Sequence, residues 1–509
     1  MAIPSVDYAF TLKYLMPNCL LLLYFLRADV YGQNGDFERA ARDHQTAIDT
    51  VPADSTAWAA LCQILKDHPN VQKEGAANWT TLAAGMENAL AQNSSSNQGV
   101  QGAKLRFALF TAHDMRRREF AKERQVKSEA VQSDATEASD ARGDLTRGAL
   151  APEPTVNEAE AASQAWQHLK AANDLEFSRQ TNERSFYESK QGQSARLEQT
   201  LKAFKHGAWP AGVGAAGQRA PVFVVGMMRS GSSLLEQVLA SHSQVVGCGE
   251  NSVFGAHAES IIGHVSAAIR AGSMENLVVG VQQSAVGVLS EMAKSCIPAH
   301  RQVGGPHGVT RMVDKQLFNF RHLGLIHLVF PDAPIVETTR NFMDVVLSIY
   351  RHNFGDSNGL GFSFNLREIV QFYVECRRAM DHWKTELPPG RVHTVRHEDL
   401  IVDLEGSSRA LLNHLGLPFE PSVLDFHATT RHVSTMSAAQ VRSPLSLKGV
   451  GAWRPYERFL VADMDALELQ LGLSEILGHT WREDPPQVKE VLRSPSRHDG
   501  IPKAKKQMT

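Results

Sequence analysis

The stretch from Pro221 to Ala240 constrains the fold of this chain more than any other. It opens with the apolar run Val222 to Val225, which is typical of a strand buried on both faces. A loop of glycine and serine follows, and from Leu234 onward apolar residues recur at helical spacing. A strand, a small-residue loop and a helix N-terminus form an anion site, because backbone N–H groups become accessible and the helix dipole favours negative charge. The alternative is an ordinary Gly/Ser turn.

This loop is close to the nucleotide-binding P-loop but lacks its lysine. Gly226 and Gly231 fit the pattern G-x-x-x-x-G-K-[ST], whereas Ser232 occupies the lysine position. The strong cation is Arg229, in the middle of the loop. A loop that holds a nucleoside triphosphate with magnesium would need the lysine, so the sequence favours a doubly charged phosphosulfate group as ligand.

Two later segments repeat the order of strand and then helix. Residues 333–340 and 392–397 are strand candidates, and helical patterns follow both. The alternation predicts an α/β fold with a P-loop-like open parallel sheet and helices on both faces. Ligands of such sheets bind beyond the carboxyl ends of the strands. The glycine loop, Arg340 and His397 are therefore expected at one edge of the sheet.

The N-terminal part has a different periodicity, typical of an all-α domain. Residues 21–54 carry small and aromatic residues at the offsets of a helix–turn–helix repeat of about 34 residues. A second unit begins at Ser55, and a third covers residues 105–121. A single repeat cannot bury its own face, so weaker neighbouring repeats are expected. The domain presents a concave surface for a protein partner or a substrate, or else it is a helical cap on the catalytic domain.

The sequence predicts five parts. Residues 126–164 are polar and rich in Ala, Ser, Glu and Asp, and they cannot bury enough apolar surface to offset the entropy of ordering. The expected parts are tetratricopeptide-like helical repeats (1–124), a polar disordered insert (125–164), a helical extension and linker (165–218), the α/β domain (219–482) and a flexible tail (483–509).

Composition excludes several classes of protein. A hydrophobic content of 43% and a formal net charge of −3 describe a soluble globular chain with no general affinity for nucleic acid. The five cysteines have no metal-ligand spacing and do not indicate a disulfide framework. The apolar run Leu20 to Leu26 is shorter than the roughly 20 residues of a membrane span, and no cleavage site follows it. We expect a cytoplasmic protein, or one of the Golgi lumen if this run acts as an anchor.

These motifs resemble those of sulfotransferases that use 3′-phosphoadenosine 5′-phosphosulfate (PAPS), specifically the type with N-terminal tetratricopeptide repeats. The likeness covers about residues 165–475, and the catalytic domain resembles that of tyrosylprotein sulfotransferases. The family's loop Gly-x-Pro-Arg-Ser-Gly-Thr-Thr is similar to Gly226 to Ser233 here, with Met228 in the place of proline. The resemblance implies that Arg229 holds the 5′-phosphosulfate. It assigns backbone and hydroxyl donors to Ser230, Gly231, Ser232 and Ser233.

The resemblance also implies the rest of the nucleotide site. Arg340 and Ser348 match the family's arginine at a strand end and the serine eight residues on, which bind the 3′-phosphate. His397 stands where the family has the tyrosine of its Tyr-Glu-Asp-Leu segment. The loop that closes over the nucleotide is assigned to Ser437, Arg442 and Lys448.

Two residues are implied in the reaction itself. Lys315, in the segment Asp314-Lys315-Gln316, resembles the family's lysine that contacts the transferring sulfuryl group. Glu250 falls where the tyrosylprotein enzymes carry their catalytic base, a role that suits a carboxylate. His242 and His257 are alternatives as base, and Glu250 is alternatively a neighbour of a helix N-cap.

The resemblance thus implies transfer of a sulfuryl group from PAPS to a hydroxyl acceptor without a metal ion. Protein tyrosine, a carbohydrate hydroxyl and a small phenol or alcohol all remain open as acceptors. One alternative is an inactive tetratricopeptide scaffold, which would have lost its nucleotide ligands. The other is a P-loop kinase that uses ATP, against which Ser232 at the lysine position argues.

Overall fold

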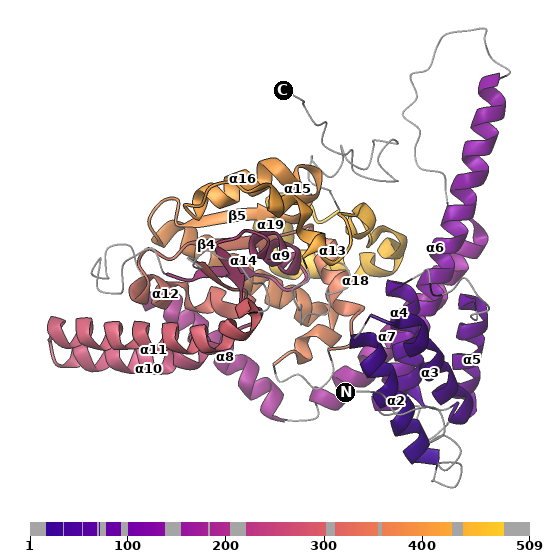
Figure 1. The fold of residues 1–509 in the computed structure, drawn as a ribbon, viewed down its shortest axis with the longest axis horizontal. Helices are drawn as coiled ribbons and strands as arrows, with labels where there is room; N and C mark the ends of the chain where they lie inside the picture. Colours follow the sequence, from indigo (N-terminus) through magenta and orange to yellow (C-terminus); the bar gives the residue numbers. More distant parts are fainter. Residues whose placement is uncertain are drawn as a thin grey trace. The chain divides into compact units, whose positions relative to one another are not determined.

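The chain divides into two compact units in the computed structural model (Figure 1). The model describes residues 17–33, 35–52, 54–68, 71, 78–92, 100–137, 154–181, 184–203, 220–301, 311–354, 359–429 and 441–482. The first unit comprises residues 1–184, 350–365 and 455–460. The second comprises residues 185–349, 366–454 and 461–509. Two short segments of the later chain thus belong to the N-terminal unit.

The first unit is built from α-helices. They are α2 (Pro17–Gln33), α3 (Phe37–Thr50), α4 (Ser55–Asp67), α5 (Trp79–Gln92), α6 (Val100–Glu137) and α7 (Val156–Thr181). Asp36 and Asp54 fix the starts of α3 and α4, because each carboxylate accepts backbone N–H bonds from the first turn. Helices α2 and α3 pair with each other and coincide with the first predicted repeat. That these helices are tetratricopeptide repeats stays a prediction.

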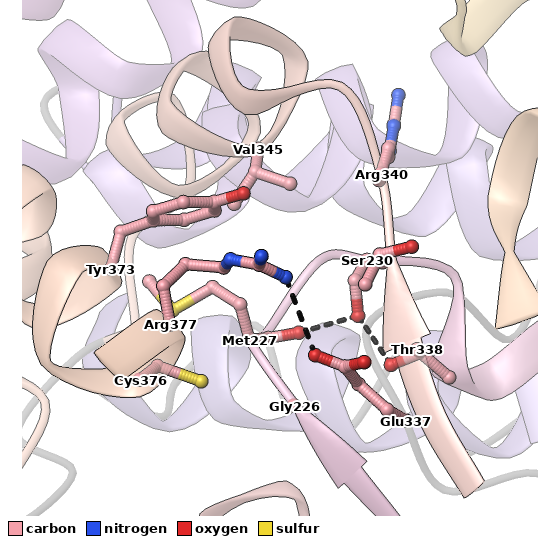
Figure 2. A pocket seen from close by; sticks show the side chains of 11 residues that line it. Gly226, Met227, Ser230, Glu337, Thr338, Arg340, Val345, Tyr373, Cys376 and Arg377 are labelled. Atoms are coloured by element: carbon pink, nitrogen blue, oxygen red, sulfur yellow. Dashed lines mark hydrogen bonds and ion pairs between the residues drawn. The ribbon is translucent and has the colours of Figure 1, made fainter. Parts of the chain in front are cut away.

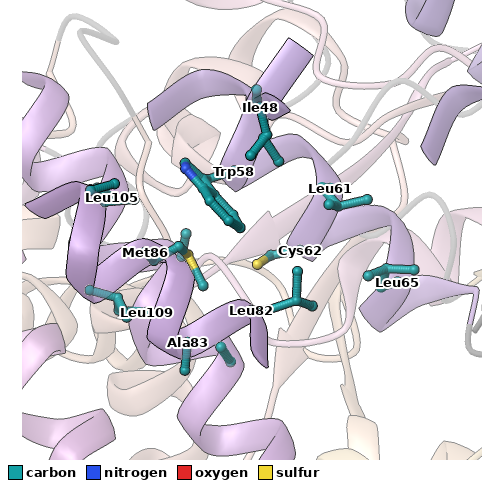
Figure 3. Close-up of a cluster of buried hydrophobic side chains, with 14 of the residues drawn as sticks. Ile48, Trp58, Leu61, Cys62, Leu65, Leu82, Ala83, Met86, Leu105 and Leu109 are labelled. Carbon is teal, nitrogen blue, oxygen red and sulfur yellow. The ribbon is translucent and has the colours of Figure 1, made fainter. Parts of the chain in front are cut away.

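A buried apolar cluster holds α3 to α6 together (Figure 3). Trp58 on α4 lies at its centre, and its indole N–H donates to Pro52 O at 2.8 Å. Gly85 on α5 is required at this contact, since a Cβ there would lie 2.7 Å from the Trp58 ring. The small residue therefore sets how closely α5 approaches α4.

Helices occupy both ends of the segment predicted to be a disordered insert, residues 125–164. Helix α6 is continuous from Val100 to Glu137, so residues 105–121 form part of one helix and not a helix–turn–helix unit. Helix α7 starts at Val156. The prediction from composition missed this pair because small residues, Ala161 and Ala165, are buried in α7 and let helices approach closely. Arg124 also pairs with Glu158 at 3.1 Å. Residues 138–153 lie outside the described part.

The second unit contains a five-stranded parallel sheet, as the α/β prediction required. Its strands are β1 (Val222–Gly226), β2 (Val245–Gly247), β3 (Arg311–Asp314), β4 (Ile335–Thr339) and β5 (Val392–Arg396). Their order is β2-β3-β1-β4-β5, and every pairing is parallel. All residues of β1 are buried, so both faces of the sheet are covered at its centre. The carboxyl ends of all five strands consequently meet at one edge.

Further helices follow in chain order, and several of them cover this sheet. They are α8 (Arg184–Ala203), α9 (Ser232–Ala240), α10 (Val253–Arg270), α11 (Met274–Arg301), η4 (Leu317–His322), α12 (Leu323–Val329), α13 (Phe342–Tyr350), η5 (Gly361–Phe364), α14 (Leu366–Glu386), α15 (His397–Val402), α16 (Leu404–His414), η6 (Pro421–Ala428), η7 (Leu447–Gly449), η8 (Arg454–Tyr456), α18 (Glu457–Leu471) and α19 (Leu473–Leu477). Helices α10 and α11 lie side by side as a hairpin (Figure 1). Among the residues described, no helix combines the length and the apolar character needed to cross a bilayer.

A disulfide corrects the expectation drawn from the cysteines. Cys248, in the loop after β2, is bonded to Cys296 of α11, with the two Cα atoms 5.0 Å apart. The pair escapes notice in the sequence because 48 residues separate the cysteines and only the packing of α11 against β2 brings them together. Cys62 and Cys376 are free and buried.

Candidate functional site

The glycine loop after β1 has a conformation that its residues dictate. Gly226 has a φ of 130°, and a Cβ on it would lie 2.6 Å from the Thr338 carbonyl oxygen of β4. Gly231 has a φ of 96°, and a Cβ there would lie 2.4 Å from His397 Nδ1. Arg229 has a φ of 65°, which is uncommon for a residue with a side chain. Both glycines are thus required by close contacts, and Arg229 is held in a turn that presents it at the sheet edge.

Ser230 fixes the glycine loop through bonds to Met227 and Thr338 (Figure 2). Its buried hydroxyl donates to Met227 O at 2.5 Å and lies 2.6 Å from Thr338 Oγ1. This hydroxyl joins the loop to β4. Ser232 and Ser233 open the first turn of α9, where backbone N–H groups have no helical acceptor.

Arg229, Ser348 and Arg340 lie close together. Arg229 Nε donates to Ser348 Oγ at 3.1 Å, although 119 residues separate them. Arg340 follows β4 and donates from Nη1 to Arg229 O at 3.2 Å and from Nη2 to Gly449 O. Among the residues that the structure describes, its buried Nε has no hydrogen-bond partner. Two guanidinium groups and a hydroxyl therefore converge at the carboxyl ends of β1 and β4.

His397 completes this side of the site. It opens α15 directly after β5, against Gly231. Burial, together with the nearby Arg340 charge, lowers the pKa of His397 to about 3. The ring is therefore neutral at physiological pH, and its buried Nδ1 has no hydrogen-bond partner within the described part of the chain. A neutral ring with an unused nitrogen can contact a nucleotide base without adding charge.

Three carboxamide and carboxylate side chains, those of Asn341, Asp344 and Glu398, hold the surrounding loops. Asn341 Oδ1 accepts the Asp344 N–H at 3.1 Å and caps α13, while the Asn341 N–H donates to Glu398 Oε1 at 2.9 Å. Asp344 Oδ2 accepts the Gly451 N–H at 2.8 Å. These bonds tie the segment after η7 and the start of α15 to the helix that carries Ser348.

The loop predicted to close over the nucleotide is described only in part. Ser437 lies outside the described residues. Arg442 is exposed, and Lys448 lies in η7, next to the Gly449 carbonyl that binds Arg340. The side chain of Lys448 is not among those described.

The two residues assigned to the reaction form an ion pair. Lys315 Nζ lies 2.8 Å from Glu250 Oε1. The Lys315 side chain is 0% exposed, whereas that of Glu250 is 58% exposed. A buried cation thus holds an accessible carboxylate at the carboxyl ends of β2 and β3. This arrangement places a proton acceptor next to a positive charge that can stabilise a developing anion.

The histidines considered as alternative bases have structural contacts instead. His242 accepts the Gln244 N–H at Nδ1, so Nε2 carries the proton that it donates to Pro418 O at 2.9 Å. His257 Nε2 lies 3.1 Å from Glu291 of α11. With both ring nitrogens of His242 engaged, Glu250 is the better placed of the candidates.

A cluster with metal-like spacing occurs in the helical unit. Ligand atoms of Glu87, His113 and His168 lie within 4.8 Å of one another. Arg116 Nη1, however, lies 3.3 Å from His113 Nδ1. Burial lowers the pKa of His113 to about 4, and the Arg116 charge adds to this effect. A guanidinium beside the ring opposes a divalent cation, so the geometry favours a hydrogen-bonded network over a metal centre.

Comparison with known proteins identifies the second unit. Residues 221–421 match the model of the Sulfotransferase family. This segment contains all five strands, the glycine loop, Lys315, Arg340 and His397. Residues 221–421 are therefore similar to the domain that the Sulfotransferase family shares.

Individual relatives add little detail. An uncharacterized protein of Aquifex aeolicus (strain VF5) is 34% identical over 251 residues, 49% of this chain and 32% of that protein. The chain thus spans about a third of the length of this relative. The sulfotransferase domain from the curacin biosynthetic pathway is 18% identical, with a TM-score of 0.29, over 44% of this chain and 83% of that one. Sulfotransferase STF1 from Mycobacterium tuberculosis H37Rv is 13% identical, with a TM-score of 0.28, over 56% and 84%.

Proposed function

We propose that the chain transfers the sulfuryl group of PAPS to a hydroxyl acceptor, with Glu250 as the general base. The observation that supports this most is the meeting of two groups of side chains at one sheet edge. Arg229, Arg340 and Ser348 form a cationic cluster with a hydroxyl, and Lys315 pairs with Glu250. The first group suits an anionic donor, and the second suits proton removal beside a developing charge.

The donor would be held by charge-assisted hydrogen bonds. Arg229 and the N–H groups at the start of α9 would bind the 5′-phosphosulfate, and Arg340 with Ser348 would bind the 3′-phosphate. The chemistry of these groups fits such a ligand, since neither the buried Arg340 Nε nor the His397 Nδ1 has a hydrogen-bond partner among the described residues. Ser437, Arg442 and Lys448 are proposed to close over the nucleotide.

The reaction needs little beyond positioning and charge stabilisation. The acceptor oxygen forms a bond to sulfur as the bond between sulfur and the 5′-phosphate oxygen breaks. Glu250 takes the acceptor proton, and 3′-phosphoadenosine 5′-phosphate leaves. Lys315 and Arg229 stabilise the negative charge on the moving sulfuryl oxygens and on the leaving phosphate.

The test is transfer of radiolabelled sulfate from PAPS to a panel of tyrosine peptides, carbohydrates and small phenols. We expect at least one acceptor to be labelled by the wild type. We expect Glu250→Gln to lower kcat by about 100-fold or more, because general-base catalysis contributes roughly 10²–10⁴-fold. Unchanged turnover by Glu250→Gln would show that another group removes the proton, and no labelling of any acceptor would contradict the proposed transfer.

A further inference from the structure

The backbone of the Glu250 loop is held by hydrogen bonds at Cys248 and Gly249. The Gly249 N–H donates to Glu236 Oε1 at 2.7 Å, and the Gly249 carbonyl accepts the Lys315 N–H at 3.0 Å. The preceding Cys248 N–H donates to Val313 O of β3 at 2.9 Å. Gly249 has a φ of 69°, so the chain turns at this residue. The turn brings Glu250 next to the Lys315 ammonium group.

Glu236 is an unusual residue for its position. It lies on α9 among apolar residues of the second turn, and it is 0% exposed. Burying a carboxylate is costly unless hydrogen bonds satisfy it, and the Glu236 carboxylate accepts a short hydrogen bond from a loop amide. Asp314, also 0% exposed, stands close enough that the Glu236 charge, in addition to burial, raises the Asp314 pKa to about 7.

Helix α9 therefore links the two halves of the site. It begins at Ser232, at the end of the anion-binding loop, and Glu236 follows one turn later. Through one hydrogen bond, a rigid helix thus connects the loop proposed to hold the donor to the residue before Glu250. A change in the bond between Glu236 and the Gly249 N–H would therefore alter the position of the Glu250 carboxylate. The contacts of the glycine loop to β4 and α15 do not involve Glu236.

We propose that Glu236 is a positioning residue, which sets the place of Glu250 relative to the donor through the Gly249 amide. This inference rests on the proposed function, because it takes Glu250 as the group that removes the acceptor proton. Glu236 itself touches neither substrate. It acts as a fixed hydrogen-bond acceptor whose removal leaves the Gly249 N–H without its partner.

The experiment compares Glu236→Gln with Glu236→Leu. Glutamine keeps an oxygen acceptor for the Gly249 N–H, whereas leucine has a similar volume and no acceptor. We expect kcat of Glu236→Gln within about 3-fold of wild type and kcat of Glu236→Leu lower by roughly 10- to 100-fold, the factor for losing a hydrogen bond to a charged group. The dissociation constant of 3′-phosphoadenosine 5′-phosphate should change by less than about 3-fold in both variants.

A control separates positioning from general destabilisation. Glu176 is a carboxylate buried in α7 of the helical unit, and Glu176→Leu should leave kcat unchanged. If Glu236→Leu does not fold, Glu236→Asp provides the test, because it keeps the charge but withdraws the acceptor by one methylene. We expect it to lower kcat with little effect on nucleotide affinity.

Hydrogen exchange of the Gly249 amide gives a readout that does not depend on turnover. It should be at least about 10-fold faster in Glu236→Leu than in wild type and unchanged in Glu236→Gln. Unchanged kcat and unchanged exchange in a folded Glu236→Leu would refute the inference. Equal losses of kcat in Gln and Leu, or equal losses of kcat and nucleotide affinity, would also refute it. If the wild type is inactive with PAPS on every acceptor, the proposed function fails, and exchange alone still decides whether Glu236 holds the loop.

Discussion

The contact between Gly231 and His397 offers a quantitative test of the site's geometry. Gly231 precedes α9 with a φ of 96°, and a Cβ on it would lie 2.4 Å from His397 Nδ1 and 3.0 Å from Cγ. The obstacle is a half-buried ring whose Nδ1 is buried. Gly231→Ala must therefore strain the loop and also displace His397 or α9.

The expected loss of stability has two parts. Placing alanine at a left-handed φ costs roughly 1–2 kcal/mol. Inserting a methyl group into a packed contact costs roughly 1–3 kcal/mol more. We thus expect Gly231→Ala to lower the free energy of unfolding by about 2–5 kcal/mol. Only the second part depends on the His397 ring.

A double-mutant cycle isolates the steric part. The free energy of unfolding is measured by urea denaturation for the wild type, Gly231→Ala, His397→Ala and the double variant. Since alanine at 397 removes the ring, we expect a coupling energy of about 1–3 kcal/mol, with the double variant more stable than the sum of the single losses predicts. Binding of 3′-phosphoadenosine 5′-phosphate, measured on the same samples, should weaken in both single variants.

Additivity within about 0.5 kcal/mol would refute this reasoning. It would mean that residues 231 and 397 do not touch. The proposed nucleotide site, in which His397 borders the glycine loop, would then lose its geometric basis.

Three further predictions concern pH, the disulfide and the helical core. Burial raises the pKa of Asp314 to about 7, so between about pH 4 and pH 7 the folded state holds a proton that the unfolded state has lost. The contribution of this group to stability therefore declines as pH rises through that range. Asp314→Asn should reduce the fall in Tm between pH 5 and pH 8. Cys296→Ser opens a covalent loop with a sequence separation of 48, and it should lower the free energy of unfolding of the oxidised protein by up to about 4 kcal/mol, with no such effect under a dithiol reductant. Gly85→Ala should lower Tm because its Cβ meets the Trp58 ring at 2.7 Å, whereas Gly263→Ala, with open space around it on α10, should raise stability by up to about 1 kcal/mol.

The parallel sheet could be predicted because its central strand has a strong local signal. Val222 to Val225 are all apolar, and a glycine loop with helical spacing follows them directly. Strand β3 could not be found in this way. Arg311 to Asp314 shows no clear alternation of apolar and polar residues, and the strand is only 4 residues long. Its place in the sheet comes from pairing with β1 and β2, and such pairing is set by tertiary structure rather than by local sequence.

In the candidate site, too, some residues have a local sequence signal and others depend on tertiary contacts. Arg229 and Arg340 stand out in the sequence because they lie in a glycine loop or follow a predicted strand, whereas Lys315 was singled out by the resemblance of the segment Asp314-Lys315-Gln316. Glu236 and the Cys248 disulfide carry no such mark, since their roles depend on contacts across the fold. A single acidic residue in the apolar stretch after the glycine loop was nevertheless a readable signal. A charge is rarely buried without a partner.

Nucleotide binding tests the central claim most directly. Calorimetry without magnesium should show that PAPS binds to the wild type and ATP does not. Arg340→Ala should weaken PAPS binding by roughly 10- to 100-fold, because it removes charge-assisted hydrogen bonds to the 3′-phosphate. Binding of ATP in place of PAPS, or PAPS binding that Arg340→Ala leaves unchanged, would contradict the account of this domain as a PAPS-dependent sulfotransferase.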